Sequence, residues 1–347
     1  MHASEIANHL ACQGSLIVSA ALRNPLPGVP LVESPFFDEI FTSVLYTEEE
    51  RRIARDLHTK GFAAFDFPDD SFDAKAEAIK SNLHSRYSWD QWRVGTANLR
   101  IQDAWSFDEN VRLLATNRRV IDLLTKLYGR QAWPFQSLSF PVGTQQHFHT
   151  DSVHFSSVPE RFMCGVWVAL EDVGDDQGPL EYYPGSHRWP IYSNEHIGTV
   201  PHGEQATQET FHELWQQLIK AHGISREVFR PKKGQALIWA ANLLHGGMPH
   251  KDKSKTRWSQ VTHYYFENCA YFTPMHSDPF RGLVKFRQPV NILTRLPMPN
   301  SYSNKPVPNT FVNAASRGFV DEPPPVRSRK LTHRLKRNVR RALGLSH

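Results

Sequence analysis

Six short segments rich in aromatic and β-branched residues fill the middle of the chain, and turn-forming residues separate them. They span residues 135–141, 145–154, 162–170, 180–184, 235–240 and 256–266. Helical segments do not alternate regularly with them, which argues against the βαβ units of a parallel sheet. The pattern therefore predicts an antiparallel double-sheet jelly roll.

Helical patterns lie mainly before these strands, so the expected fold is mainly β with flanking helices. Thr47 is a good N-cap for the first helix, because the three glutamates that follow it suit the helix dipole. Further elements are expected at 62–67 (strand), 71–87 (helix), 98–107 (extended) and 109–127 (helix). A helical insert at about 205–225 interrupts the later strands. It is either a lid over a site or a helix packed on the surface of the barrel.

Composition divides the chain into four parts. Residues 1–45 lack a clear period and are predicted to be an N-terminal extension, and residues 46–290 are the predicted folded domain. Residues 291–325 are expected to be a proline-rich linker. In residues 326–347, apolar side chains at near-helical spacing oppose a face of arginines and lysines, which predicts a basic amphipathic tail.

The net charge of +5 is concentrated in that tail. Eight Lys or Arg residues and no acid lie between Arg327 and Arg341, which leaves 32 basic and 35 acidic residues in the rest of the chain. The tail is expected either to contact an anionic membrane surface or to be a solvated charge run. Aromatic residues are not interleaved with its basic residues, so nucleic acid is not an expected partner.

Cysteine usage and the N-terminus bear on the cellular compartment. Cys12, Cys164 and Cys269 are isolated, which argues against a disulfide framework or a thiolate zinc site and suits a reducing cytosol. The apolar patch at 15–22 is too short to span a membrane, and no basic segment precedes it. We therefore expect a cytoplasmic protein that the tail could hold at the inner face of a membrane.

His149 and Asp151 lie two residues apart in the segment at 145–154. On an extended strand, side chains at i and i+2 leave the same face, so both are expected to point into the barrel. A His-x-Asp pair alone is weak support for a metal site, because the chain has 18 histidines. His147, on the face of His149, and His154, on the opposite face, are rival ligands or plain hydrogen-bonded histidines.

A second imidazole far along the chain strengthens the metal hypothesis. His245 follows an apolar strand and directly precedes two glycines, Gly246 and Gly247, which allow a backbone to approach a ligand closely. Two imidazoles and one carboxylate make the facial triad that binds Fe(II) and leaves positions open. The simpler interpretation of His245 is a histidine in a β-turn.

Arg257 begins the strand after His245, and Ser259 and Val261 are expected to share its inward face. A buried arginine needs an anionic partner, and a dicarboxylate co-substrate would supply one through a bidentate pair. The alternative is a pair with a protein carboxylate at the mouth of the barrel. Trp167 is expected either to wall the co-substrate site or only to fill the core.

Over roughly residues 46–270 the chain resembles the phytanoyl-CoA dioxygenase family. The resemblance rests on the order and spacing of His149-x-Asp151, Gly178-Pro179-Leu180, Pro184-Gly185-Ser186-His187, Lys233-Gly234, His245-Gly246 and Arg257. It implies a cupin-like double-stranded β-helix that uses Fe(II) as cofactor and 2-oxoglutarate and O2 as co-substrates. It also implies a structural role for the turn at 184–187.

The resemblance assigns roles to individual residues. His149, Asp151 and His245 would bind iron, and Arg257 would bind the distal carboxylate of 2-oxoglutarate, with Trp167 close by. Ser259 and Thr150 are taken as further co-substrate contacts. Two positions depart from the family pattern: Thr150 stands where a glutamine is often found, and Gly247 stands where a serine often assists the arginine. These departures affect co-substrate contacts rather than the reaction class.

The expected reaction is hydroxylation of an unactivated C–H bond in a small molecule or a lipid-linked sugar. A Kdo residue of a lipopolysaccharide precursor is one candidate substrate. Because Asp151 is present, the resemblance disfavours a halogenase, since those relatives lack the carboxylate. The alternative function is that of a non-catalytic or zinc-bearing cupin-like binding protein.

Overall fold

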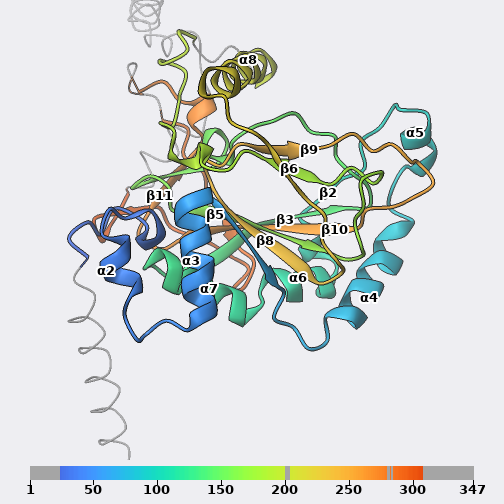
Figure 1. Ribbon diagram of the computed structural model, residues 1–347, viewed down its shortest axis with the longest axis horizontal. Coiled ribbons are helices and arrows are strands. Elements are labelled where there is room, and N and C mark those ends of the chain that lie inside the picture. The colour runs from blue at the N-terminus through green and yellow to red at the C-terminus, as the bar shows by residue number, and fades with distance from the viewer. Residues whose placement is uncertain (1–23, 200–203, 280–281, 283, 308–347) are drawn as a thin grey trace, which may run out of the picture.

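The computed structural model describes residues 24–199, 204–279, 282 and 284–307, and its main strands form two antiparallel sheets (Figure 1). The large sheet contains, in spatial order, β1 (Phe62–Asp66), β8 (Gln235–Ala240), β5 (Met163–Ala169), β10 (Ser259–Phe266), β3 (Ala132–Phe140) and β2 (Ile101–Gln102). The small sheet contains β7 (Glu227–Phe229), β6 (Leu180–Tyr182) and β9 (His245–Gly247). The two sheets confirm the predicted jelly roll.

Helices cover the face of the large sheet that points away from the small one, as Figure 1 shows. These helices are α3 (Glu48–Lys60), α4 (Phe72–His84), α6 (Glu109–Ala115) and α7 (Arg118–Tyr128). The remaining helical elements are η1 (Leu31–Glu33), α2 (Phe37–Phe41), α5 (Trp89–Arg93), η2 (Ala104–Ser106), η3 (Asp151–Val153), η4 (Ser186–Arg188), α8 (Glu204–His222) and η5 (Pro274–His276). Short ribbons complete the fold: β4 (Ser156–Val158) with β11 (Ala270–Phe272), β12 (Val290–Asn291) with β13 (Leu296–Pro297), and β14 (Ser301–Tyr302) with β15 (Lys305–Pro306).

Strand β5 separates two apolar layers, because its side chains alternate between the faces of the sheet. Val166 and Val168 pack in the large core shared with the helices, whereas Trp167 and Ala169 belong to a smaller cluster between the sheets. Every residue of this strand is buried, so it reads as a continuous apolar run. The inner layer is where a ligand site can form between the two sheets.

Helix α3 begins and ends as its sequence predicts. The Thr47 hydroxyl accepts a hydrogen bond from the Glu50 N–H at 3.2 Å, and the Glu50 carboxylate accepts one from the Thr47 N–H at 2.8 Å. This capping box satisfies two backbone donors that the helix would otherwise leave free. The helix ends at Gly61, whose φ of 87° suits glycine.

Two predicted elements that precede the main strands differ from the observed ones. The helix predicted at 109–127 is two helices, α6 and α7, because the Asn117 side chain accepts a hydrogen bond from the Val120 N–H and starts a new helix. The segment predicted to be extended at 98–107 contains only the two strand residues of β2, followed by the 3-10 turn η2. Apolar spacing did not reveal the break between α6 and α7, since a hydrogen bond to a single polar side chain produces it.

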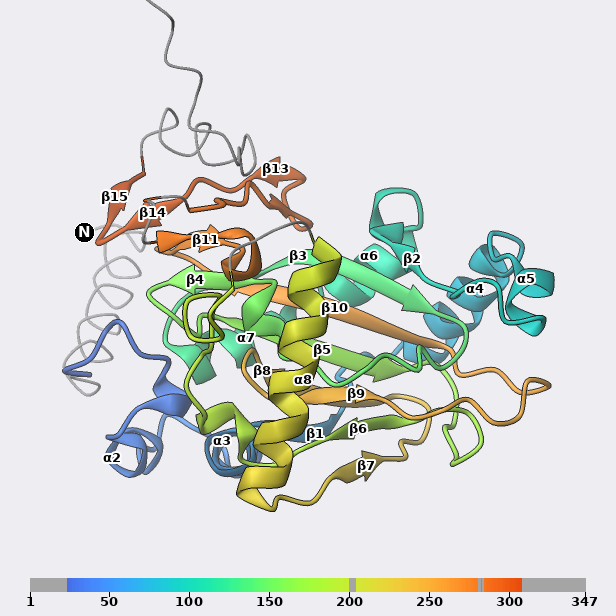
Figure 2. The same cartoon turned by 90° about the horizontal axis from the view of Figure 1, so that it is seen from above.

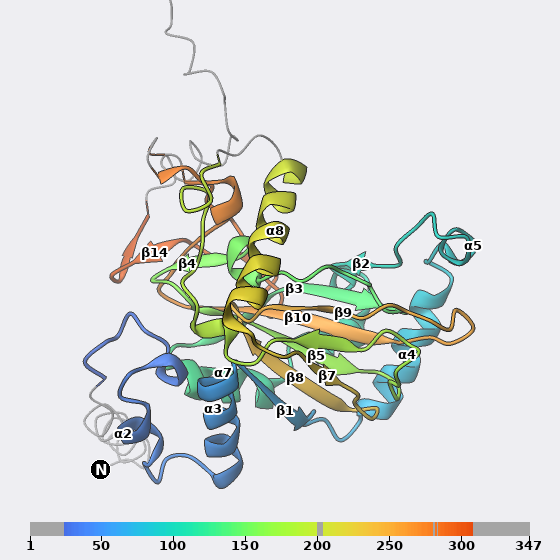
Figure 3. The same ribbon diagram turned by 45° about the horizontal axis from the view of Figure 1, so that its top comes forward.

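The helical insert is present as α8, which lies on the side of the small sheet (Figures 2 and 3). Phe211 and Trp215 of α8 pack in one cluster with Val153 and Leu244, residues that flank the predicted metal ligands in sequence. The helix therefore supports these segments from outside. No described residue of α8 lines the cavity between the sheets, so the lid interpretation is not supported.

The folded domain extends beyond both of its predicted boundaries. Leu31, Val32 and Phe37 are buried in the main core, so the later part of the predicted N-terminal extension belongs to the domain. Residues 290–307 form two hairpins rather than a linker, and the Ile292 N–H donates to the carbonyl of Pro134 in β3 at 2.9 Å. The basic tail at 326–347 lies outside the described residues. Within the described ranges, no helix combines the length and apolarity needed to cross a bilayer.

Candidate metal centre

A reciprocal pair of backbone hydrogen bonds brings the two predicted histidine ligands together. The His149 N–H donates to the His245 carbonyl at 2.9 Å, and the His245 N–H donates to the His149 carbonyl at 3.0 Å. The two residues are therefore directly opposed, and their ring centroids lie 4.4 Å apart. Strand β9 and the chain before η3 thus fix the two imidazoles side by side.

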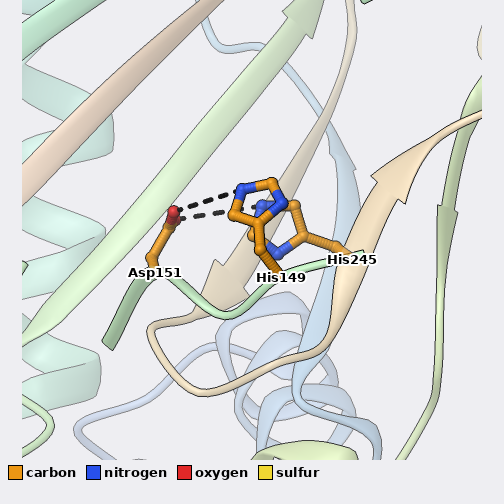
Figure 4. A group of neighbouring side chains, drawn as sticks. All are labelled: His149, Asp151 and His245. Carbon is orange, nitrogen blue, oxygen red and sulfur yellow. Dashed lines mark ion pairs between the residues drawn. The ribbon is translucent and has the colours of Figure 1, made fainter. Parts of the chain in front are cut away.

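Asp151 completes the group, as Figure 4 shows. Its Oδ1 lies 3.8 Å from His149 Nε2, and its Oδ2 lies 4.0 Å from His245 Nε2. One ligand atom from each residue lies within 4.8 Å of the others, and all three residues are 9% exposed or less. Two imidazole nitrogens and one carboxylate at this separation fit one Fe(II) ion.

The local chain is not the strand that the sequence predicts at 145–154. Gln145 has a φ of 51°, His149 forms an isolated bridge, and Asp151 opens the 3-10 turn η3. The i, i+2 argument still holds for the ligands, because Thr150 between them is extended, with φ −109° and ψ 141°. The two side chains therefore converge although no regular strand contains them.

Backbone carbonyls orient both imidazoles. His149 Nδ1 lies 2.9 Å from the His147 carbonyl, and His245 Nδ1 lies 3.0 Å from the Leu243 carbonyl. A carbonyl can only accept, so each Nδ1 carries the proton and each Nε2 presents its lone pair toward Asp151. Burial, followed by the neighbouring His245, lowers the pKa of His149 to about 3, so this ring is neutral and able to bind a metal at neutral pH.

Trp239 holds the carboxylate of Asp151 by a hydrogen bond, and His263 lies beside it. The Trp239 indole N–H donates to Oδ2 at 2.7 Å, and His263 Nε2 lies 3.6 Å from the same oxygen. Burial opposes ionisation, but the surrounding histidines and the Trp239 N–H hold the pKa of Asp151 at about 2. The indole fits because residue 165 is glycine: a Cβ there would overlap its six-membered ring.

Sequence reasoning missed both of these supporting residues. His263 lies on the inward face of β10, four residues after Ser259 and six after Arg257, so the same i+2 count that placed Arg257 also applies to it. Trp239 had no comparable signal, because its contact with Asp151 depends on how β8 registers against β5. A tryptophan in an apolar strand is ordinary core material by sequence alone.

A cavity of about 250 Å³ lies between the sheets and is lined by the three ligands together with Trp167 and Arg257. The Arg257 guanidinium lies 5.6 Å from the Trp167 ring centroid. Arg257 is only 1% exposed, and its Nε and Nη1 have no hydrogen-bond partner. The ion pairs of the described residues include none to Arg257; against the effect of burial, the charge of Glu171 raises the pKa of Arg257, but the two side chains form no ion pair.

Two more buried polar atoms near Arg257 lack partners: Ser259 Oγ and Trp167 Nε1. Burial lowers the pKa of Arg257 to about 10, which leaves the guanidinium charged at neutral pH. Buried polar groups are normally hydrogen-bonded, and a buried charge without a partner is costly. A carboxylate of 2-oxoglutarate would supply the missing acceptors, so these residues fit the dicarboxylate co-substrate. Ser259 is buried but is not among the residues that line the cavity.

Three other residues, Thr150, His147 and His154, do not lie where the sequence predicts. Thr150 bonds to the Ser152 hydroxyl at 3.1 Å and does not line the cavity, because it points away from the face shared by its neighbours. We therefore remove Thr150 from the expected co-substrate contacts. The His147 ring lies 5.2 Å from that of His212 on α8, whereas His154 lines the cavity. Their predicted faces are reversed, because the chain is not a continuous strand.

Gly246 and the turn at 184–187 have structural roles. A Cβ on Gly246 would lie 2.9 Å from the Gln146 carbonyl oxygen, so the glycine permits close approach of the chain that carries His149, and Gly246 also lines the metal cavity. In the turn, the Ser186 hydroxyl donates to the Tyr183 carbonyl at 2.7 Å and accepts from the Leu244 N–H at 2.9 Å. The turn therefore fixes the residue that precedes His245.

Comparisons with known proteins agree with this geometry. The family model described as phytanoyl-CoA dioxygenase matches residues 42–257, more than half of the chain. A search of curated proteins gives no significant match. Among solved structures, the non-heme alpha-ketoglutarate-dependent carbocyclase SnoK from nogalamycin biosynthesis has a TM-score of 0.50 and 15% identity, over 65% of this chain and 86% of SnoK. This likeness shows the fold.

Two further solved structures are similar at lower TM-scores. EctD from S. alaskensis with bound Fe has 19% identity and a TM-score of 0.49, over 68% of this chain and 81% of EctD. The epimerase SnoN, in complex with Fe3+, alpha ketoglutarate and nogalamycin RO, has 19% identity and a TM-score of 0.48, over 70% and 95% of the two chains. The family match and the His149–Asp151–His245 group together identify the chain: it belongs to the phytanoyl-CoA dioxygenase family and is an Fe(II)- and 2-oxoglutarate-dependent dioxygenase.

Proposed function

We propose that the protein hydroxylates an unactivated C–H bond of a small, polar organic molecule. The observation that carries this proposal is the pairing of two features in one cavity: the His149–Asp151–His245 group and the buried, unpartnered guanidinium of Arg257. The first would hold the iron, and the second would hold a co-substrate carboxylate. A non-catalytic or zinc-bearing binding protein has no need of that arginine, and family membership sets this alternative aside.

Each residue has a definable task. When bound, iron with 2-oxoglutarate supplies the activation of dioxygen, and the co-substrate is released as succinate and carbon dioxide. His149 and His245 offer preoriented Nε2 lone pairs, and Trp239 keeps the Asp151 carboxylate in place. Arg257 fixes one end of the co-substrate. Leu138, Phe140 and Val261 give the cavity apolar walls that exclude water from the reacting centre.

The substrate, by this proposal, is a small molecule or a lipid-linked sugar, and a Kdo residue of a lipopolysaccharide precursor remains one candidate. A cytoplasmic location with peripheral membrane contact through residues 326–347 also remains part of the proposal. Its support is the charge pattern of the tail, at about 1 kcal/mol of attraction per basic residue near an anionic surface. Deleting residues 326–347 should lower binding to anionic vesicles; unchanged partition would end the membrane proposal.

A succinate-release screen tests the reaction. Purified protein is incubated with Fe(II), 2-oxoglutarate and air, and with acyl-CoAs, nucleotide sugars or lipid A precursors as candidate substrates. The masses of the products are measured by mass spectrometry. Hydroxylation predicts substrate-dependent succinate and a product heavier by one oxygen atom, both abolished by Asp151→Ala. A product that has lost two hydrogens and gained no oxygen would contradict hydroxylation and indicate another oxidative outcome.

A further inference from the structure

A second cavity, of about 480 Å³, adjoins the metal cavity. Four residues line both: Gln102, Gln136, His154 and Phe155. Gln136 also links the second cavity to the ligand group, because its Oε1 lies 2.8 Å from Nδ1 of His263, whose other ring nitrogen faces Asp151. A single molecule can therefore extend from the metal centre into the second cavity.

The second cavity is cationic. Lys285 and Arg287 line it, and none of the described residues that line it is Asp or Glu. Cavity walls of one sign concentrate ions of the opposite sign. This cavity is therefore suited to an anionic group and unsuited to a cation or a purely apolar chain.

The Arg287 side chain is held in one orientation, but no carboxylate of the described residues neutralises its charge. Its guanidinium stacks over the Phe155 ring at 4.7 Å, and its Nη1 donates to Thr273 Oγ1 at 3.3 Å. Its Nε is buried and has no hydrogen-bond partner. Within the described ranges, no carboxylate pairs with Arg287. An aromatic ring and a hydroxyl thus hold the fork of the guanidinium in one orientation while its charge remains without a partner.

Neutral polar groups complete the lining. Gln136 commits its amide oxygen to His263, which leaves its amide N–H groups as donors, and Gln102 is exposed at the mouth. Amide donors and acceptors beside cations suit a ligand that carries hydroxyl groups as well as an acid. The four shared residues form the boundary between the two cavities, so such a ligand would meet them on its way to the metal.

We propose that this second cavity binds the anionic end of the substrate, with Arg287 as the main recognition residue and Lys285 as a second cation. The substrate class is then a hydroxyl-bearing small molecule with a carboxylate or phosphate group, whose oxidised carbon lies toward the metal centre. This inference rests on the proposed hydroxylase function. The two arginines have separate tasks: Arg257 serves the co-substrate and Arg287 serves the substrate.

Binding calorimetry tests the inference without turnover. Protein saturated anaerobically with Fe(II) and 2-oxoglutarate is titrated with glucose, glucuronate and glucose 6-phosphate. We expect at least one of the two anionic probes to bind about tenfold or more tightly than glucose, and added salt to reduce this preference. The comparison of glucuronate with glucose 6-phosphate shows which acid the site prefers. Arg287→Gln should weaken binding of the preferred probe by about tenfold to a hundredfold, because the charged hydrogen bonds are lost.

Matched variants separate recognition from folding. Arg287→Lys keeps the charge but loses the fork, so its affinity should lie between those of wild type and Arg287→Gln. Arg295→Gln and Lys305→Gln each remove one exposed cation that does not line the cavity and should bind like wild type. The inference is overturned if neither anion is preferred over glucose, including the case in which nothing binds, or if Arg287→Gln matches Arg295→Gln.

The same samples distinguish this inference from the function on which it rests. The visible absorption band that 2-oxoglutarate gives with protein-bound Fe(II) is recorded before each titration. A normal band without anion preference removes the substrate class and leaves the oxygenase function intact. A missing band in folded protein contradicts the proposed function itself.

Discussion

Arg257 lies where folding alone would not place a charge. It is 1% exposed, and two of its nitrogens have no partner, although a buried unpaired charge removes several kcal/mol from stability. A buried charge without partners is retained in a fold when a bound ligand supplies its hydrogen-bond acceptors. The sequence position of Arg257 suggested this role, and its unpartnered atoms give the physical reason for it.

Arg257→Met is therefore predicted to separate stability from binding. The variant without ligand should unfold at a temperature no lower than wild type, because it removes an uncompensated charge at similar volume. In wild type, 2-oxoglutarate with Fe(II) at a hundred times its Kd should add about 2.7 kcal/mol, or about 5 °C. The variant should lose this shift. Thermal unfolding with and without 2-oxoglutarate measures both effects, and a retained shift would argue against the assignment.

Trp239 is predicted to set iron affinity through Asp151. Trp239→Phe keeps a ring in the space that Gly165 provides but removes the 2.7 Å hydrogen bond to the carboxylate. Changes in such supporting contacts typically weaken metal binding by about tenfold to a hundredfold. Anaerobic Fe(II) titration measures the effect. Trp89→Phe is the matched control, because it removes an indole bond of equal length to the His84 carbonyl, away from the metal centre.

At the scale of single residues, the sequence predicts the three metal ligands but not the side chains that contact Asp151. His149 and Asp151 are two residues apart, so local geometry alone brings them together. His245 was found only through its glycine context and the family resemblance. The contacts of Trp239 and His263 with Asp151 depend on strand register across β8, β5 and β10, which no local spacing encodes.

At the scale of elements, the close approach of β9 to the chain at 144–148 decides the geometry of the metal centre. His149 and His245 bond to each other through their backbones, and Gly246 permits the contact because it has no side chain. The sequence predicted most strands of the two sheets, since their apolar runs and turns are strong signals. It overextended the one at 145–154, because a run of polar and aromatic residues fits a strand and an irregular loop equally well.

Gly246→Ala tests that approach. The new methyl group would lie 2.9 Å from the Gln146 carbonyl oxygen, a backbone atom, so β9 must move away from the chain that carries His149. We expect a folded protein with Fe(II) affinity reduced by at least about tenfold. Gly28→Ala is the control, because its methyl group would meet only the Pro159 side chain, at an ordinary contact distance of 3.6 Å. Equal iron affinity in the two variants would show that the close contact does not set the ligand geometry.

At the scale of the whole molecule, several neutral histidines are built into the interior. Burial lowers the pKa of His149 to about 3 and that of His187 and His263 to about 4, against about 6.5 in an unfolded chain. The unfolded chain therefore binds protons first as the pH falls, and stability decreases from about pH 6.5 toward pH 4. Asp151, with its pKa near 2, keeps its charge over this window.

The predicted loss at pH 5 is about 2 kcal/mol for each of the three rings relative to neutral pH. Urea unfolding of metal-free protein at pH 7.5 and pH 5 measures it through the free energy of unfolding. A free energy that stays constant or rises at pH 5 would mean that folding does not lower the pKa of these rings.

The extent of the domain was predicted less well than its centre. Residues 31–41 and 290–307 lack strong periodicity, yet they pack on the core, because isolated apolar side chains such as Leu31 and Ile292 are enough to hold short segments once the sheets exist. Composition alone could not separate these segments from true linkers. The metal centre was predictable because its chemistry needs particular residue types, whereas peripheral packing needs only apolar surface.

The proposed function requires one metal centre that binds iron and 2-oxoglutarate together. Under anaerobic conditions, wild-type protein with Fe(II) and 2-oxoglutarate should give the weak visible charge-transfer band of that complex. His149→Ala should lose the band while keeping its circular dichroism spectrum, because one of the three ligands is gone. The absence of a band in folded wild-type protein, or an equal band in His149→Ala, would contradict the account.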